Sequence, residues 1–77
     1  MIDLSIINRI EMECKDETWY RLILTDIEGR QFIFNGVASG YAGEGPMGTV
    51  QILVDLGMSE DVKDFVYNVH GFVLTRD

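Results

Sequence analysis

The strongest candidate for chemistry in this chain of 77 residues is the segment GYAGEGPMG, which runs from Gly40 to Gly48. It holds four of the eight glycines and the only proline. Glycine lets a backbone curl and lets a ligand approach it closely. If Pro46 begins a helix, the N–H groups of the first turn are free and carry a partial positive charge. Such a turn can bind an anion.

Two side chains of this segment are suited to contact a partner, because Tyr41 offers a ring for stacking and Glu44 accepts hydrogen bonds or pairs with a cation. We predict a binding site formed by Tyr41, Gly43, Glu44, Gly45, Pro46 and Met47. The first interpretation is a protein partner bound by the loop at residues 40–48. The alternative is a small ligand, an anion or a nucleotide-like molecule, at the start of the helix beginning at Pro46. A third is that the loop is only a turn that leads the chain onto a sheet.

Two nucleotide-binding motifs resemble this loop, but neither fits. A P-loop needs Lys and Ser or Thr after its last glycine, and Gly48 is followed by Thr49 and Val50. The stretch Gly43–Gly48 spells G-x-G-x-x-G, but it does not join a strand to a helix in a βαβ unit. Glu44 would also repel a phosphate. The sequence therefore predicts no cofactor.

The side chains that usually carry catalysis are scarce. His70 is the only histidine and Cys14 the only cysteine, so a zinc site with several such ligands is not predicted. His70 precedes a glycine at the expected end of a helix, where histidine usually has a structural role. Cys14 falls on the apolar face of a predicted strand and is expected to be buried. We predict a non-catalytic protein with no metal.

The net charge of −7 disfavours phosphate polymers and anionic membranes as partners. The six basic residues are scattered along the chain, which leaves a protein partner as the main expectation. One cysteine allows no internal disulfide, and the first residues, MIDLSIINRI, lack the pattern of a signal peptide. No apolar run approaches the ~20 residues of a spanning helix. We expect a cytoplasmic protein.

These candidate residues must be positioned by a sheet and two helices. Apolar residues alternate with polar ones from Ile2 to Cys14, which is typical of a strand with one buried face. Asn8 breaks the alternation, so a bulge is expected near it. The runs TWYRLILT and RQFIFNGV are rich in strand-forming residues and follow short polar turns. We predict a three-stranded antiparallel meander over residues 2–37.

The second half of the chain predicts two helices and a short last strand. The stretch 49–56 fits either a strand or a helix, and we favour a helix over Pro46–Leu56 because proline suits a first turn and Gly57 a helix end. Residues 59–69 predict a second helix, with Ser59 as N-cap, from a stripe of four apolar residues at helical spacing. They are Val62, Phe65, Val66 and Val69. The run FVLTR then predicts a strand.

The predicted fold is therefore a single α+β domain over residues 1–77, in the order β-β-β-α-α-β, with both helices packed on one face of the sheet. Neighbouring residues of a strand point to opposite faces, so Trp19 and Tyr20 cannot share one core. We therefore predict a homodimer that covers the second face. Glu11 and Glu13 lie on the polar face of the first strand, which is the second place to look for a partner site.

Overall fold

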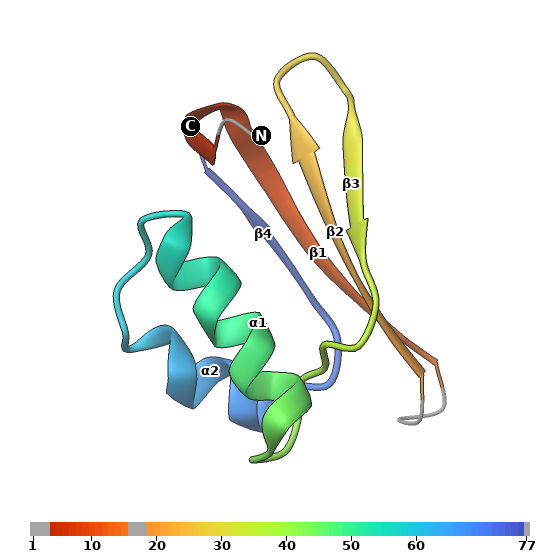
Figure 1. The fold of residues 1–77 in the computed structure, drawn as a ribbon, viewed down its shortest axis with the longest axis vertical. Coiled ribbons are helices and arrows are strands. Elements are labelled where there is room, and N and C mark those ends of the chain that lie inside the picture. The colour runs from red at the N-terminus through yellow and green to blue at the C-terminus, as the bar shows by residue number, and fades with distance from the viewer. Residues whose placement is uncertain (1–3, 16–18, 77) are drawn as a thin grey trace.

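Four antiparallel strands and two helices follow one another in the predicted order in the computed structural model, which describes residues 4–15 and 19–76 (Figure 1). The α+β fold and its β-β-β-α-α-β order are therefore confirmed. The elements are a 3₁₀ turn η1 (Leu4–Ile6), β1 (Ile7–Lys15), β2 (Trp19–Asp26), β3 (Gln31–Phe34), α1 (Glu44–Asp55), α2 (Val62–Asn68) and β4 (Phe72–Thr75).

The strands form one sheet in the order β3-β2-β1-β4, and all neighbours are antiparallel. The three strands of the predicted meander, β1, β2 and β3, are neighbours in the sheet, and the predicted turn between β1 and β2 lies outside the described residues. After the helices, β4 returns to the free side of β1, where Arg9 pairs with Thr75 and Met12 with Phe72. The first strand is thus an inner strand, and β3 and β4 are the two edges.

The predicted first strand begins later than expected. Leu4–Ile6 form a 3₁₀ turn instead of strand, and the predicted strand residues 2 and 3 lie outside the described residues. The expected bulge is confirmed, because the register of β1 against β2 shifts between Ile7 and Arg9. An extra residue in a bulge reverses which face the preceding residues point to. Ile7, which interrupts the alternation in the sequence, is accordingly buried.

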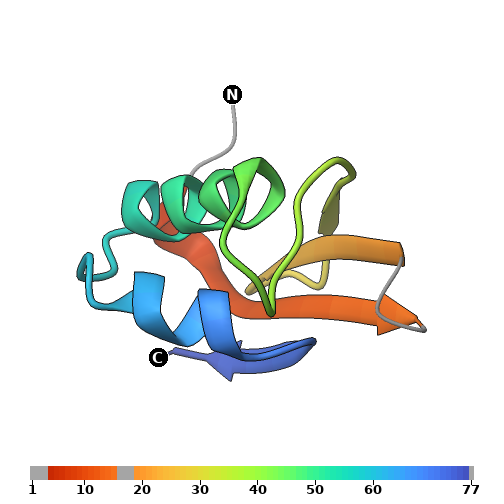
Figure 2. The ribbon, with the colours of Figure 1, turned by 90° about the horizontal axis from the view of Figure 1, so that it is seen from below.

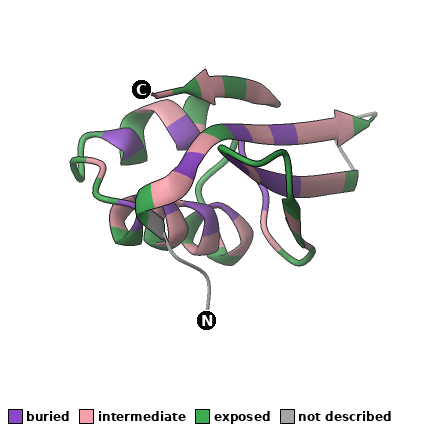
Figure 3. Cartoon of the chain, turned by 90° about the horizontal axis from the view of Figure 1, so that it is seen from above, coloured by how far each residue is buried: buried purple, intermediate pink, exposed green. Residues whose placement is uncertain are grey.

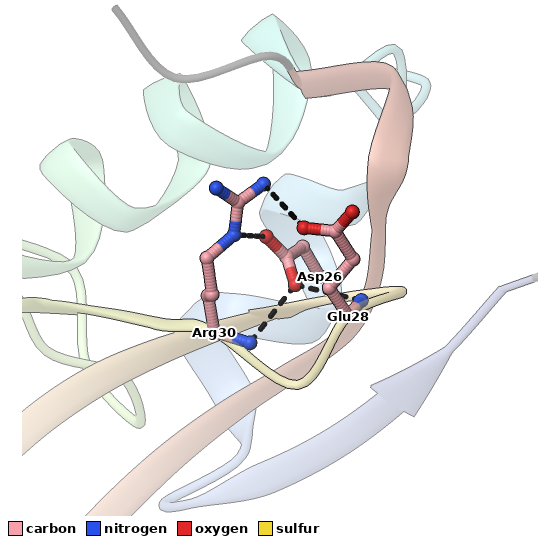
Figure 4. Close-up of polar contacts among 3 residues, drawn as sticks. All are labelled: Asp26, Glu28 and Arg30. Atoms are coloured by element: carbon pink, nitrogen blue, oxygen red, sulfur yellow. Dashed lines mark hydrogen bonds and ion pairs between the residues drawn. The ribbon is translucent and has the colours of Figure 1, made fainter.

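The turn between β2 and β3 is organised by the buried carboxylate of Asp26 (Figure 4). One oxygen accepts hydrogen bonds from the N–H groups of Glu28 and Arg30, both at 2.9 Å, and the other accepts from Nε of Arg30 at 2.7 Å. Burial alone would raise the pKa of Asp26. These hydrogen bonds and the guanidinium charge outweigh it and hold the pKa below the ordinary value of 3.8.

Both helices form where the sequence predicts them, with shifted ends. Helix α1 spans Glu44–Asp55, so it begins two residues before Pro46 and the strand alternative for 49–56 is wrong. Helix α2 spans Val62–Asn68 and is shorter than the predicted 59–69. Ser59 is not its N-cap, because its hydroxyl accepts from the N–H of Asp61 in the preceding turn.

Both helices lie on one face of the sheet, and the core fills the space between them and the strands (Figure 2). Along the strands, buried positions alternate with more exposed ones, as the bands in Figure 3 show. The core is formed by Ile7, Ile10, Met12, Leu22, Leu24, Leu53, Leu56, Val62 and Val66. Phe65 is half-buried and meets Phe72 edge-on, with ring centroids 5.1 Å apart. Three residues of the predicted stripe, Val62, Phe65 and Val66, therefore face the core, whereas Val69 lies beyond the end of α2.

Candidate functional site

The first part of the glycine-rich loop is fixed to the rest of the fold by hydrogen bonds. The N–H of Gly40 donates to the carbonyl of Val66 in α2 at 2.8 Å. Just before it, the buried hydroxyl of Ser39 accepts from the N–H of Gly71 at 3.2 Å. The hydroxyl of Thr49 in α1 donates to the carbonyl of Ala38 at 2.7 Å. Residues 38–40 therefore join both helices to the start of β4.

Gly40 is required at its position for two reasons. Its φ of +90° belongs to the left-handed region, and the ring of His70 occupies the space that a Cβ would need. Nδ1 of His70 is also hydrogen-bonded to the hydroxyl of Tyr20 at 2.9 Å, so the ring is held in place. At this end, the loop has the structural role that the turn interpretation predicts.

The second part of the loop runs into α1. Gly43 precedes the helix with extended backbone, and its carbonyl accepts from the N–H of Met47 at 3.0 Å. Glu44 is the exposed first residue, and Pro46 is the buried third residue. The prediction that the helix begins at Pro46 is therefore wrong by two residues. Proline fits anywhere in the first turn, because the N–H groups there have no partner within the helix.

This geometry weakens the case for an anion at the start of α1. Pro46 has no N–H, so within the first three helical residues only Glu44 and Gly45 can offer one. The carboxylate of Glu44 stands at the same end of the helix and would repel an anion. The hydroxyl of Tyr41 lies close to Gly45 and restricts access to its backbone. The anion site remains a prediction with less support than the sequence alone gave it.

A hollow of about 380 Å³ lies between the loop and the start of β2. We call it the aromatic hollow, and it is lined by Trp19, Tyr20, Asn35, Gly36, Val37, Ala38, Tyr41 and Gly45. Tyr41 is 47% exposed, and its ring meets that of Tyr20 at 60° with centroids 6.3 Å apart. The rings are therefore fixed by packing while part of their surface is open to solvent.

A second hollow, of about 290 Å³, lies between the two helices and includes Met47. We call it the interhelical groove; its lining residues are Met47, Val50, Gln51, Val54, Glu60, Lys63 and Tyr67. Met47 is 58% exposed and does not line the aromatic hollow. The six predicted site residues therefore do not form one surface. Tyr41 and Gly45 line the aromatic hollow, Gly43 and Glu44 lie beside it at the start of α1, and Pro46 is buried.

The sequence analysis missed Trp19 and the segment 35–37 as neighbours of Tyr41. The strand register brings them together. Phe34 pairs with Leu22 in antiparallel strands, so the residues after Phe34 run alongside those before Leu22. The Gly36 turn, with φ of +82°, then directs the chain back over the sheet. The paired aromatic residues Trp19 and Tyr20 were the available signal.

The possible metal-ligating side chains are dispersed over the described residues. Within residues 4–15 and 19–76, no three side chains of His, Cys, Asp or Glu lie close enough together to hold a metal ion. Cys14 is half-buried rather than fully buried as expected. In the same part of the chain, no helix combines the length and the apolar character needed to cross a membrane.

Comparisons of the chain with protein-family models, with curated proteins and with solved structures gave no match.

Proposed function

We propose that this chain is a non-catalytic binding protein that holds a short segment of a partner protein in the aromatic hollow. The observation that carries the proposal is the open, preformed hollow of about 380 Å³ beside Tyr41. Its volume is near the lower end of the ~300–1,000 Å³ typical of ligand sites. It would accommodate one or two side chains of a peptide.

The chemistry of the lining residues suits a peptide. Tyr and Trp are among the residues most enriched at binding hot spots, since each offers a large rigid surface with a polar end. Asn35 and the backbone at Gly36 add donors and acceptors. Among the described residues, no charged side chain lines the hollow, but the chain carries a net charge of −7. Positive charges flanking the bound segment would therefore speed association.

The strand next to the hollow favours an extended peptide. β3 is an edge strand that pairs only with β2 among the described residues, and the segment directly after it, residues 35–37, lines the hollow. An edge strand can bind a peptide as an additional strand. A peptide lying along β3 would thus lead one of its side chains into the hollow beside Tyr41.

We further propose that this binding takes place in the cytoplasm, as expected from a chain with only Cys14 and therefore no internal disulfide. A reducing compartment also suits its half-buried thiol.

The proposal is tested by selecting peptides that bind the protein from a random display library and measuring their affinity by the fluorescence of Trp19, the only tryptophan. Tyr41→Ala should weaken binding about tenfold or more, as expected for a hot-spot residue. Tyr41→Phe, which keeps the ring, should retain most of the affinity. Met47→Ala is the matched control, because it removes an exposed side chain from the interhelical groove and should leave affinity unchanged.

Melting curves of each variant separate loss of binding from loss of fold. The proposal is wrong if the selected peptides bind Tyr41→Ala as tightly as the parent protein while the variant is folded. Peptides that lose affinity only in Met47→Ala would place the site in the interhelical groove.

A further inference from the structure

We propose that the face of the sheet opposite the helices binds the same face of a second copy of this chain, so that two sheets stack in a homodimer. This face is formed by the odd-numbered strand residues from Arg9 onward, and we call it the open face. The even-numbered residues, such as Ile10 and Leu22, point into the core. Both helices lie on that core side (Figure 2). The proposal does not rest on the aromatic hollow, although Trp19 belongs to both surfaces.

One row of four residues, three of them apolar, crosses the open face. Glu11 pairs with Ile23 on one side and with Val73 on the other, and Ile23 pairs with Ile33. These residues therefore lie in one line across all four strands. Ile33 is 49% exposed and Val73 is 52% exposed, whereas Ile23 is only 6% exposed between them. The two exposed β-branched residues, Ile33 on β3 and Val73 on β4, can therefore contact a second sheet from the two edges of this one.

The charges of the open face favour a second copy of this chain as the molecule that binds there. Arg9 lies 3.3 Å from Glu11 and Arg21 lies 3.0 Å from Glu13, so both acidic residues of this face have a basic partner. Lys15 is a third basic residue. Three of the six basic residues of the chain thus lie here, with two of the nine acidic residues that the structure describes. Two copies with a net charge of −7 repel each other least when these faces meet.

The same charges disfavour other occupants. A basic partner would find both carboxylates, Glu11 and Glu13, already paired. In a symmetric dimer, by contrast, each Arg–Glu pair meets identical pairs of the other copy, and opposite charges can be placed side by side across the twofold axis.

The size of the open face indicates how tightly two copies of the chain should bind each other. Four strands at a spacing of about 4.8 Å give a width of about 19 Å, and the nine residues of β1 give a length of about 30 Å. The two edge strands have only four residues each. The face is therefore smaller than the ~800 Å² per partner of a standard interface. A dimer with a dissociation constant in the micromolar range is expected, with sheets about 10 Å apart.

Sedimentation equilibrium from about 1 µM to about 500 µM tests the proposal. The parent chain should change from monomer to dimer within this range. The double variant Ile33→Glu, Val73→Glu should weaken the dimer about tenfold or more. The matched control is Ile27→Glu, Met47→Glu, which adds the same two negative charges at exposed positions in the β2–β3 turn and on α1. It should keep the parent dissociation constant within about twofold.

A second double variant tests whether weaker dimerisation is caused by misfolding. Ile33→Thr, Val73→Thr keeps β-branched side chains, so the strands should form, but it removes apolar surface and should weaken the dimer as well. A parent chain that is still a monomer at about 500 µM overturns the proposal. It is also overturned if the folded open-face variants dimerise like the parent, or if the control pair weakens the dimer as much as they do.

Discussion

Replacing Gly40 by alanine should destabilise the protein more than any other glycine-to-alanine change at an exposed turn. Backbone in the left-handed region costs a residue with a Cβ about 1–2 kcal/mol, and Gly40 has φ of +90°. The new methyl group would also overlap the ring of His70. The ring would have to turn away and lose its 2.9 Å hydrogen bond to Tyr20, which adds about 0.5–1.5 kcal/mol.

The total of about 1.5–3.5 kcal/mol is large for a domain of this size. For domains of 60–100 residues, 1 kcal/mol lowers the melting temperature by about 4–8 °C, so the expected decrease is about 6–28 °C. The matched control is Gly29→Ala, where φ is +84° and nothing lies within 4 Å of the added Cβ. It should lose only the backbone part, about 1–2 kcal/mol. Urea unfolding and calorimetry measure both variants.

A double-mutant cycle with His70→Ala isolates the contact with the ring. Once the ring is absent, Gly40→Ala should lower the free energy of unfolding by no more than Gly29→Ala does. The reasoning is refuted if Gly40→Ala and Gly29→Ala are equally destabilised with His70 present. Gly40 would then be needed only for its backbone conformation.

Two further predictions concern buried polar groups. The folded-state pKa of Asp26 is lowered, so the stabilising effect of its carboxylate is complete above the unfolded value of 3.8 and is lost as the pH falls below that value. The free energy of unfolding of the parent chain should therefore exceed that of Asp26→Asn by less at about pH 3 than at about pH 6. A constant difference would contradict the assigned hydrogen bonds. Thr49→Val should cost about 1–3 kcal/mol in urea unfolding, since it leaves the carbonyl of Ala38 without the hydroxyl that donates to it; a neutral result would show that this bond contributes little.

The fold was predictable from the sequence where local patterns are strong. Period-two alternation identified β1, and the helical stripe of Val62 and Val66 identified α2. The ends were less predictable, because η1 and the bulge at Ile7–Arg9 depend on how β1 meets β2. The start of α1 was placed at Pro46, although proline tolerates several positions of a first turn.

The candidate site was predictable only in part, for a topological reason. Tyr41 stands out in the sequence because it lies in a glycine-rich loop. Trp19 and the segment 35–37 become its neighbours only through the pairing of β2 with β3 and the turn at Gly36. The role of Gly40 was also hidden, since it depends on His70, which is 30 positions away in the chain.

A last prediction uses Trp19 to separate the two proposed interactions. Trp19 lines the aromatic hollow, and the guanidinium of Arg21 lies 5.3 Å from its ring centroid on the open face. Its emission should therefore shift to shorter wavelengths as the protein is concentrated, since stacking removes water from the open face. It should shift again when a selected peptide is added to dilute protein. Ile33→Glu, Val73→Glu should abolish only the first shift, and Tyr41→Ala only the second. If either variant abolishes both shifts while remaining folded, the hollow and the open face are not independent sites.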